Sequence, residues 1–384
     1  MRLVHVGHVP FRPEVGTPYH LSLALARYMP VIYINPPLSF GGWASSRRFF
    51  KSSDGVYDLD VVSVVMPGQL RFLPRRWRKK PTEWLMLPWV LRSLRGINPH
   101  SMVLWVSNSE LALVLHRRLR PRLTCYHRLD DFGAMDPSLA PLERSLEQIA
   151  DIIFVVAPAL RDQHWARGRE AILLPNAVNR TLFERALDES LAVPTDLQKI
   201  PRPRVGFIGW ITPRWIDIEL ILEIARRRPD WSLVLIGPKV SWHPISLPSN
   251  CYLIGARPYA QLPAYLKGID VCLIPFKEGA IRDGASPLKL YEYLAAGRAV
   301  VSTPVPGLDN FEELVWCASN ADEFVESIEQ ALGEAHNPRA QSRRTEAVAP
   351  HTWEARAHFV MEHLSRWLHD VPAPASSPSA PPAW

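Results

Sequence analysis

The chain has 384 residues, of which 47% are hydrophobic, and a formal net charge of +6. This length exceeds what one hydrophobic core usually holds, so we expect two domains. No apolar run approaches the length of a membrane-spanning helix, and residues 1–7 lack the apolar region of a signal peptide. The composition disfavours an integral membrane protein and a secreted one, and we expect a cytoplasmic protein.

The first half of the chain alternates short apolar runs with helical patterns. Strands are predicted at residues 3–6, 31–34, 59–65, 102–106, 123–126 and 152–156. One helix is predicted to begin at Leu21, and another to cover residues 139–150. This alternation is typical of a doubly wound parallel sheet with helices on both faces.

The second half repeats the same alternation from Val205 to Val301. Residues 188–203 lose their periodicity and hold several prolines, so we interpret them as a connection between domains. An amphipathic helix rich in Trp and His is expected near the end, followed by a disordered tail of Pro, Ala and Ser. The predicted organisation is an N-terminal domain at 1–187, a linker at 188–203, a C-terminal domain at 204–350, a helix at 351–370 and a tail at 371–384.

The cysteines and early histidines give no metal-binding or disulfide pattern. The cysteines are Cys125, Cys251, Cys272 and Cys317, which are widely spaced and lie mostly in apolar runs. They are predicted to be small buried residues in a reducing compartment. His5, His8 and His20 lie near the first loop, where histidines are more often structural than metal ligands. No metal site is predicted.

Residues 286–303 read SPLKLYEYLAAGRAVVST, the most informative stretch of the chain. Ser286 followed by Pro287 predicts an N-cap and a first helical residue, and Gly297 predicts the end of that helix. The β-branched residues that follow predict a buried strand. A helix N-terminus presents unpaired N–H groups and partial positive charge, so this one could bind a diphosphate.

Lys289 and Glu292 lie three residues apart, on one face of this helix. The ammonium could reach a phosphate oxygen, and the carboxylate could accept hydrogen bonds from ribose hydroxyls. An ordinary i, i+3 ion pair on a solvated helix face is the alternative interpretation.

The segment resembles the nucleotide-sugar motif of GT-B glycosyltransferases, in particular the family 4-like enzymes of the group 1 type and their polysaccharide-biosynthesis relatives. That motif has the form (P)xKxxEYLAxGxPVV. Four further stretches resemble elements of the same template, in the same order. They are LPNAVN at 174–179, VGFIG at 205–209, VLIGP at 234–238, and GARPY at 255–259 with the following LPAYL. This order is more specific than any single motif.

The resemblance implies a GT-B fold, in which two Rossmann-like domains face a cleft and the last helix crosses back to the N-terminal domain. It also implies transfer of a sugar from a nucleotide-sugar donor to a hydroxyl of a glycan or polyprenyl-linked acceptor. Bacterial cell-surface polysaccharide assembly is the expected setting, and no cofactor or obligatory metal is expected. A nucleotide-sugar epimerase of the same fold and a non-catalytic sugar-nucleotide binding protein are the alternatives.

The resemblance also assigns candidate residues to the donor. Arg214 matches the basic residue that meets the diphosphate, and Arg257 and Tyr259 match the loop that holds the base. The predicted donor-binding residues are Gly209, Arg214, Arg257, Tyr259, Ser286, Pro287, Leu288, Lys289 and Glu292. Gly16 and Thr17 match the loop that admits the acceptor, although the family's double glycine is absent here.

The family's sugar-facing acid is missing from its usual place. Many members carry a Glu eight residues before the ribose-binding Glu, and here that residue is Gly284. Asp283, one residue earlier, or Glu278 could supply the acid instead. Retention and inversion of configuration therefore both stay open.

A second group of catalytic candidates follows the strand predicted at residues 123–126. His127 falls where family members place a histidine that contacts the donor sugar, and Asp130 and Asp131 fall where related sequences carry a VDDY pair. An inverting transfer needs a base to take the acceptor's hydroxyl proton, and one of these groups could serve. One of the two acids could instead cap the next helix.

Basic residues interleave with Phe and Trp from Arg71 to Lys80, and no acidic residue occurs from Val61 to Thr82. Residues 40–51 repeat this pattern. Cations and aromatic rings together suit an anionic membrane surface, so peripheral attachment to the inner face of the cell membrane is one interpretation. A solvated loop without a partner is another. Nucleic acid is disfavoured because no nucleic-acid-binding motif accompanies the charge.

Overall fold

The computed structural model describes residues 1–36, 38–39, 48–51, 58–63, 65–66, 86–243 and 246–368. The basic segment at 71–80, most of the stretch at 40–51 and the tail at 371–384 lie outside these residues. The chain divides into two compact units. Of the described residues, the first unit holds Met1–Leu174 and those from Arg356 to Leu368, and the second holds Pro175–Ala355.

The first unit is built on an eight-stranded sheet with the order β10-β9-β8-β7-β1-β2-β5-β4. Its neighbouring strands run parallel except β4, which is antiparallel to β5. The strands are β1 (Arg2–Val6), β2 (Val31–Ile34), β4 (Arg48–Lys51), β5 (Asp58–Val62), β7 (Met102–Val106), β8 (Leu123–Arg128), β9 (Ile152–Val155) and β10 (Ile172–Leu173). A separate two-stranded sheet pairs β3 (Leu38–Ser39) with β6 (Val65–Met66).

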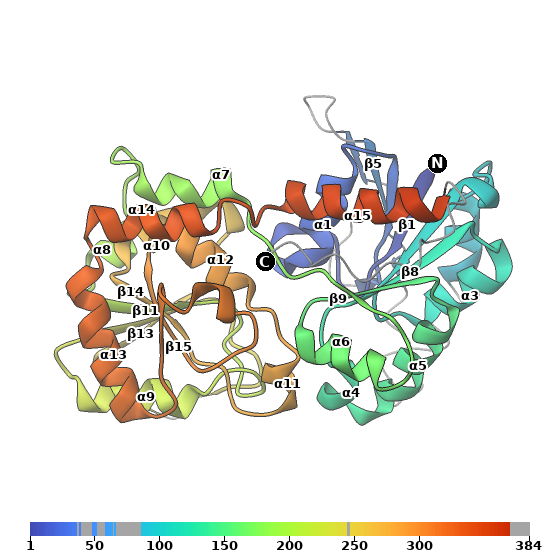
Figure 1. Cartoon of the computed structure of the whole chain (residues 1–384). Helices are drawn as coiled ribbons and strands as arrows, with labels where there is room; N and C mark the ends of the chain where they lie inside the picture. The colour runs from blue at the N-terminus through green and yellow to red at the C-terminus, as the bar shows by residue number, and fades with distance from the viewer. Residues whose placement is uncertain are drawn as a thin grey trace. The chain divides into compact units, whose positions relative to one another are not determined.

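Helices cover both faces of the first sheet (Figure 1). They are η1 (Pro13–Val15), α1 (Thr17–Leu25), residues 86–93, η3 (Pro99–Ser101), α3 (Glu110–Leu119), α4 (Phe132–Met135), η4 (Pro137–Leu139), α5 (Ala140–Ile149), α6 (Pro158–Trp165) and α15 (Trp353–Leu368). Aliphatic residues of one face pack with α3, α5 and α6. The other face carries the aromatic side chains of His5, Trp105 and Phe154. The ring of Phe154 also contacts that of His363 in α15, with the ring centroids 6.2 Å apart.

The second unit is built on a six-stranded parallel sheet with the order β13-β12-β11-β14-β15-β16. The strands are β11 (Arg204–Ile208), β12 (Ser232–Ile236), β13 (Cys251–Gly255), β14 (Val271–Ile274), β15 (Ala299–Ser302) and β16 (Val315–Cys317). The strand order reverses between β11 and β14. Ligands of such Rossmann-like sheets bind outside the carboxyl ends of the strands at this reversal.

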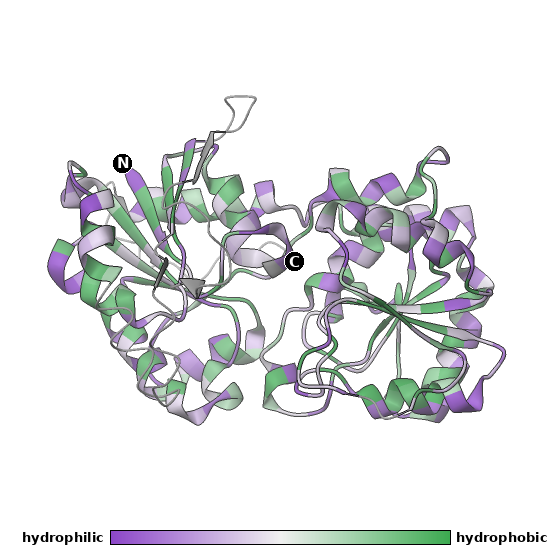
Figure 2. Ribbon diagram, turned by 180° about the vertical axis from the view of Figure 1, so that it is seen from behind, coloured by the Kyte–Doolittle hydropathy of each residue, from purple (hydrophilic) through white to green (hydrophobic). Residues whose placement is uncertain are grey.

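Two helical layers enclose the second sheet (Figure 1). Its helices are α7 (Arg180–Phe183), η5 (Glu184–Leu187), α8 (Thr195–Gln198), α9 (Ile218–Arg227), η6 (Tyr259–Gln261), α10 (Leu262–Gly268), α11 (Ala280–Asp283), α12 (Leu288–Ala295), η7 (Asp309–Phe311), α13 (Ala321–Glu334) and α14 (Pro338–Ala347). Helices α9 and α13 pack on one face, and α7, α10 and α12 on the other. Figure 2 shows hydrophobic strands inside each unit and hydrophilic positions on the outer sides of the helices.

The predicted alternation of strands and helices is confirmed, but the unit boundary differs from the expected one. The first unit ends at Leu174 rather than at residue 187. Residues 188–203, interpreted above as a linker, also belong to the second unit, because Leu197 and Ile200 are buried in its core. The guanidinium of Arg204 fixes this segment through hydrogen bonds to the carbonyls of Ile200 and Gln198.

The structure also bears on the expectations for the cysteines, for metal sites and for membrane-spanning helices. All four cysteines are free; Cys125, Cys251 and Cys272 are buried, whereas Cys317 is exposed. Within the described part of the chain, no cluster of three or more His, Cys, Asp or Glu side chains has a geometry suited to a metal ion. The described helices include none that is both long and apolar enough to cross a membrane.

The close approach of β11 and β12 at their carboxyl ends predicts a strict requirement for glycine. At Gly237, where φ is +146°, a Cβ atom would lie 1.8 Å from the carbonyl oxygen of Gly209. We expect Gly237→Ala to lower the free energy of unfolding by more than about 2 kcal/mol, through backbone strain and steric overlap. Urea denaturation of the purified variant measures this.

Gly333→Ala is the matched control. Gly333 lies inside α13, and a Cβ atom there meets nothing within 4 Å. This variant should gain about 0.4–1 kcal/mol, because alanine restricts the unfolded chain and favours the helix. Equal effects of the two alanine substitutions would contradict the steric argument.

Candidate functional site

Helix α12 begins where the strand order of the second sheet reverses, after the loop that follows β14. Pro287 stands at the N-cap and makes no side-chain cap. The main-chain N–H groups of Leu288 and Lys289 donate no hydrogen bond to any described residue. The first turn of α12 therefore presents two free amides together with the positive end of the helix.

The prediction that Ser286 caps this helix was wrong. The Ser286 hydroxyl instead accepts a hydrogen bond from the main-chain N–H of Asn176 at 3.1 Å. The Ser286 carbonyl accepts a second one from the Asn176 side-chain amide at 2.6 Å. A partner 110 residues away competes with the local cap, and this partner cannot be seen in the local sequence pattern.

The predicted end of α12 is confirmed. Gly297 adopts φ +69° and donates its N–H to Leu294, and Arg298 donates its N–H to Tyr293. This pair of bonds is a Schellman motif, which turns the chain directly into β15.

The side of α12 that faces the sheet is fixed to the end of β11. The hydroxyl of Tyr293 accepts a hydrogen bond from the N–H of Ile208 at 2.9 Å and donates one to its carbonyl at 3.3 Å. Gly209, with φ +153°, follows at once, and a Cβ atom there would lie 2.1 Å from Cε of Lys289. Lys289 therefore lies directly over Gly209, and only a glycine at that position leaves room for its side chain.

The Lys289 ammonium forms no hydrogen bond or ion pair with any described residue. Its Nζ lies 5.5 Å from the centroid of the Phe207 ring. Burial lowers the pKa of Lys289, and the charge of Glu292 partly opposes that shift. A partly desolvated cation beside free helix amides is well suited to bind an anion.

Glu292 is buried, so a solvated surface ion pair does not describe it. Its Oε1 atom has no hydrogen-bond partner among the described residues. Burial raises the pKa of Glu292 to about 7, although the Lys289 charge and the neighbouring Tyr259 hydroxyl lower it. Tyr259 is itself buried and packs edge-on against Phe183 at 5.4 Å. The described residues thus leave a buried carboxylate oxygen without a hydrogen bond.

The other predicted donor residues lie on loops. Arg214 is exposed, in the loop after β11. Arg257 is held by Asp196 at 2.7 Å and by the Tyr265 hydroxyl at 2.6 Å. Its guanidinium is therefore already engaged by other side chains of the second unit.

The two acids considered as replacements for the missing family acid are both exposed. Asp283 lies 3.3 Å from Arg282, and Glu278 lies 3.9 Å from the same arginine. Their assignment to the sugar stays a prediction.

In the first unit, His127 lies at the end of β8 and is buried against Trp105, with ring centroids 5.3 Å apart. Burial, together with the nearby His8, lowers the pKa of His127 to about 3, so its imidazole is neutral. Its Nε2 atom has no partner among the described residues. His5 is satisfied by the hydroxyls of Ser22 at 2.7 Å and Ser107 at 3.3 Å.

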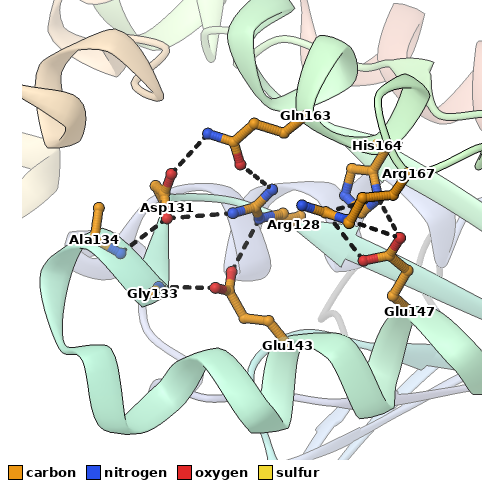
Figure 3. Close-up of polar contacts among 9 residues, drawn as sticks. All are labelled: Arg128, Asp131, Gly133, Ala134, Glu143, Glu147, Gln163, His164 and Arg167. Atoms are coloured by element: carbon orange, nitrogen blue, oxygen red, sulfur yellow. Dashed lines mark hydrogen bonds and ion pairs between the residues drawn. The ribbon is translucent and has the colours of Figure 1, made fainter.

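The two adjacent acids after β8 have different surroundings. Asp131 caps α4 by accepting the N–H of Ala134 at 2.9 Å, and it also accepts a hydrogen bond from Gln163 (Figure 3). The capping alternative is therefore confirmed for Asp131. Asp130 is half-buried and makes no hydrogen bond with the described residues. Burial, followed by the charges of Asp131 and Glu143, raises the pKa of Asp130 to about 7.

Sequence reasoning missed the network that holds Asp131. Arg128 donates to Glu143 at 2.9 Å and to Gln163 at 2.8 Å, and lies 3.2 Å from Asp131 (Figure 3). Glu143 also accepts the N–H of Gly133 at 2.8 Å. No motif carries this signal.

The loop expected to admit the acceptor leads into α1. Gly16 has φ +76° and precedes the helix, and Thr17 is buried in its first turn. The helix therefore begins at Thr17, four residues before the predicted start at Leu21. The acceptor role of Gly16 and Thr17 stays a prediction.

Two comparisons with known sequences both match glycosyltransferases. A family model described as glycosyl transferase-like matches residues 214–362, which include α12. TuaH of Bacillus subtilis, which carries the name of a teichuronic acid biosynthesis glycosyltransferase, is 28% identical over 221 residues. That match covers 54% of this chain and 54% of TuaH, so it spans about half of the relative.

Comparison with solved structures covers nearly the whole chain. A sucrose-phosphate synthase from Thermosynechococcus elongatus aligns with a TM-score of 0.72 and 17% identity, over 96% of this chain and 99% of the other. HepE from Anabaena, solved in complex with UDP and glucose, aligns with a TM-score of 0.63 and 13% identity, over 94% and 99%. A trehalose-6-phosphate structure from E. coli, bound with UDP-2-fluoro glucose, gives 0.67 and 12%, over 97% and 100%.

Two Rossmann-like units with these structural neighbours define the GT-B fold, which confirms the predicted fold class. The family match across α12 and the similarity to TuaH make the chain similar to glycosyltransferases over part of its length.

The contrast between Asp130 and Asp131 predicts opposite effects of the same substitution. Because the pKa of Asp130 is raised to about 7 in the folded state, its carboxylate destabilises the fold increasingly as the pH rises from about 4 to 7. Asp130→Asn should therefore raise the free energy of unfolding at pH 8 by roughly 1–3 kcal/mol, and by less at pH 5. Urea denaturation at the two pH values measures both numbers.

Asp131→Asn is the control, because it removes the charge that faces the buried guanidinium of Arg128, whereas asparagine can still cap α4. It should lower stability by about 1–3 kcal/mol at pH 8, the cost of losing a charge-assisted contact. A loss of stability in both variants would show that Asp130 also has a structural partner.

Proposed function

We propose that this protein transfers a sugar from a nucleotide-sugar donor to a hydroxyl group of an acceptor. The observation that carries the proposal is the start of α12 at the strand reversal. Two free amides, the Lys289 ammonium and the Oε1 atom of Glu292, which has no hydrogen bond with the described residues, lie there. A nucleoside diphosphate satisfies all three groups, because it offers phosphate oxygens to the cations and amides and ribose hydroxyls to the carboxylate.

The chemistry of transfer requires stabilisation of the departing diphosphate. Negative charge builds on it as the bond to the sugar breaks. In this proposal the amides of Leu288 and Lys289 and the Lys289 ammonium oppose that charge, and Arg214 adds a second cation from its exposed loop. These groups supply positive charge directly, so no obligatory metal is expected.

The ribose and base are assigned to neighbouring groups. Glu292 accepts hydrogen bonds from ribose hydroxyls, and Tyr259 lies near its carboxylate. The main chain at Arg257–Tyr259 contacts the base. Gly209 belongs to the site because it admits the Lys289 side chain.

On the acceptor side, Asp130 is the candidate base. It is half-buried and unpaired with the described residues, and a pKa near 7 suits a group that accepts a proton at neutral pH. His127 is assigned to the donor sugar through its free Nε2, and Gly16 and Thr17 to the acceptor loop. Asp283 is the remaining candidate for the sugar-facing acid.

The proposed acceptor is a glycan or polyprenyl-linked glycan of a bacterial cell-surface polysaccharide. The similarity to TuaH, with its name from teichuronic acid biosynthesis, supports this class. Lipid-linked acceptors lie at the membrane, and the basic aromatic segment from Arg71 to Lys80 would bring the protein to its anionic inner face.

Calorimetric titration with UDP, GDP, ADP and dTDP, first without metal and then with magnesium, tests the donor site. One of the four should bind without metal. Failure of all four in both conditions would contradict the proposed site. Incubation with the matching nucleotide sugar and no acceptor then separates an epimerase, which changes the sugar, from a transferase.

Substitution of Glu292 predicts a pH-dependent loss of affinity. Glu292→Ala should weaken nucleotide binding at pH 8 by about 1–3 kcal/mol, because it removes a charged hydrogen-bond acceptor. The wild-type affinity should rise from pH 6 to pH 8 as the carboxylate, with its pKa of about 7, loses its proton. The variant should lack this rise.

Glu223→Ala is the matched control for this titration. Glu223 lies on α9 of the same unit and pairs with Arg226 and Arg227 at the surface. Its substitution should leave both the affinity and its pH dependence unchanged. An unchanged affinity in a folded Glu292→Ala protein would remove Glu292 from the site.

A further inference from the structure

Within the described residues, the chain passes from one unit to the other after Leu174 and again after Ala355. Within the second unit, the segments next to these two points lie side by side. Val178 pairs with Thr352 in a parallel bridge, and its N–H donates to the carbonyl of His351 at 3.0 Å. Val178 and His351 are both buried. We call residues 175–179 and 351–352 together the joint.

The joint is bound to the start of α12 through Asn176. The main-chain N–H of Asn176 donates to the hydroxyl of Ser286, and its side-chain amide donates to the carbonyl of the same residue. Ser286 lies two residues before Leu288, the first residue of α12. This two-point contact fixes both the position and the orientation of the peptide that enters the helix.

A second contact holds the middle of α12. The ring of His351 lies 5.5 Å from the ring of Tyr291 and 5.3 Å from that of Phe311. Tyr291 and Phe311 contact each other edge-on at 5.8 Å. All three residues are buried, so this aromatic cluster ties the joint to the helix one turn beyond Ser286.

The contact with Asn176 also explains why the first turn of α12 is open. A serine just before a helix usually caps it by accepting an N–H of the first turn. Here the hydroxyl of Ser286 is engaged by Asn176 instead, and the amides of Leu288 and Lys289 stay free. The same interaction therefore places the helix and leaves its N–H groups available to an anion.

We propose that Asn176 is a positioning residue for the nucleotide site: it holds Ser286 so that the free amides of α12 and Lys289 are preorganised for a diphosphate, with His351 as the second support. The inference rests on the proposed function for its ligand. Its physical basis is that binding groups held in place before binding do not have to be ordered by the ligand.

The test is Asn176→Asp, which keeps the shape of the side chain but turns a hydrogen-bond acceptor toward the Ser286 carbonyl. It should weaken binding of the nucleoside diphosphate that the wild type prefers about tenfold, a change that calorimetry measures readily. In the free protein, amide hydrogen exchange across residues 287–295 should become faster. Asn176→Ser, which loses the amide without adding a charge, should show both effects if the aspartate variant does not fold.

Asn250→Asp is the matched control. The Asn250 side-chain amide also donates to main-chain carbonyls of the second unit, those of Ala225, Arg228 and Trp231, and it lies just before β13, an edge strand of the sheet. Its substitution should lower the melting temperature and leave nucleotide affinity and exchange in α12 unchanged.

Two outcomes overturn the inference. One is unchanged exchange in α12 in a folded Asn176 variant, and the other is an equal change in Asn250→Asp. The exchange measurement uses no nucleotide, so it decides the positioning role even if the wild type binds none of the four nucleotides. That last result would overturn the proposed function alone.

Discussion

The candidate site depends on how α12 is fixed to the end of β11. The hydroxyl of Tyr293 bonds both main-chain groups of Ile208, and the next residue, Gly209, leaves room for Lys289. A side chain at Gly209 would displace the ammonium, and one at Gly237 would displace Gly209 itself. The two glycines and the tyrosine thus bring a helix N-terminus, a cation and a carboxylate to the strand reversal, where such sheets bind ligands.

Both units keep ionisable groups in surroundings that disfavour their charged forms. Burial raises the pKa values of Glu292 and Asp130 to about 7 and lowers that of Lys289. The described residues leave Oε1 of Glu292 and the Lys289 ammonium without hydrogen bonds. Unsatisfied buried groups cost stability, and they are expected where a ligand completes the hydrogen bonding. The acid pair shows the contrast: Asp131 is satisfied by a cap and an arginine, and Asp130 is not.

Much of the fold was predictable because its signals are local. Apolar β-branched runs predicted most strands within one or two residues, and Gly297 predicted the end of α12 because a Schellman motif needs a left-handed residue. Elsewhere, contacts with residues distant in the sequence made the prediction from the local pattern wrong. Ser286 follows the pattern of a cap but binds Asn176, and residues 188–203 look like a linker but place Leu197 and Ile200 in the second core. The network of Arg128 with Glu143 and Gln163 had no sequence signal, since it joins three separate elements.

The sequence by itself predicted the GT-B fold, the resemblance to glycosyltransferases and the helix that is proposed to carry the donor site. Its motifs are contiguous, and their order along the chain is preserved in the GT-B glycosyltransferases it resembles. Only the tertiary structure decided which of these residues are free to act. Burial, hydrogen bonding and charge depend on atoms brought together from distant positions, so Asp130 and Asp131, adjacent and chemically identical in the sequence, differ in the folded protein.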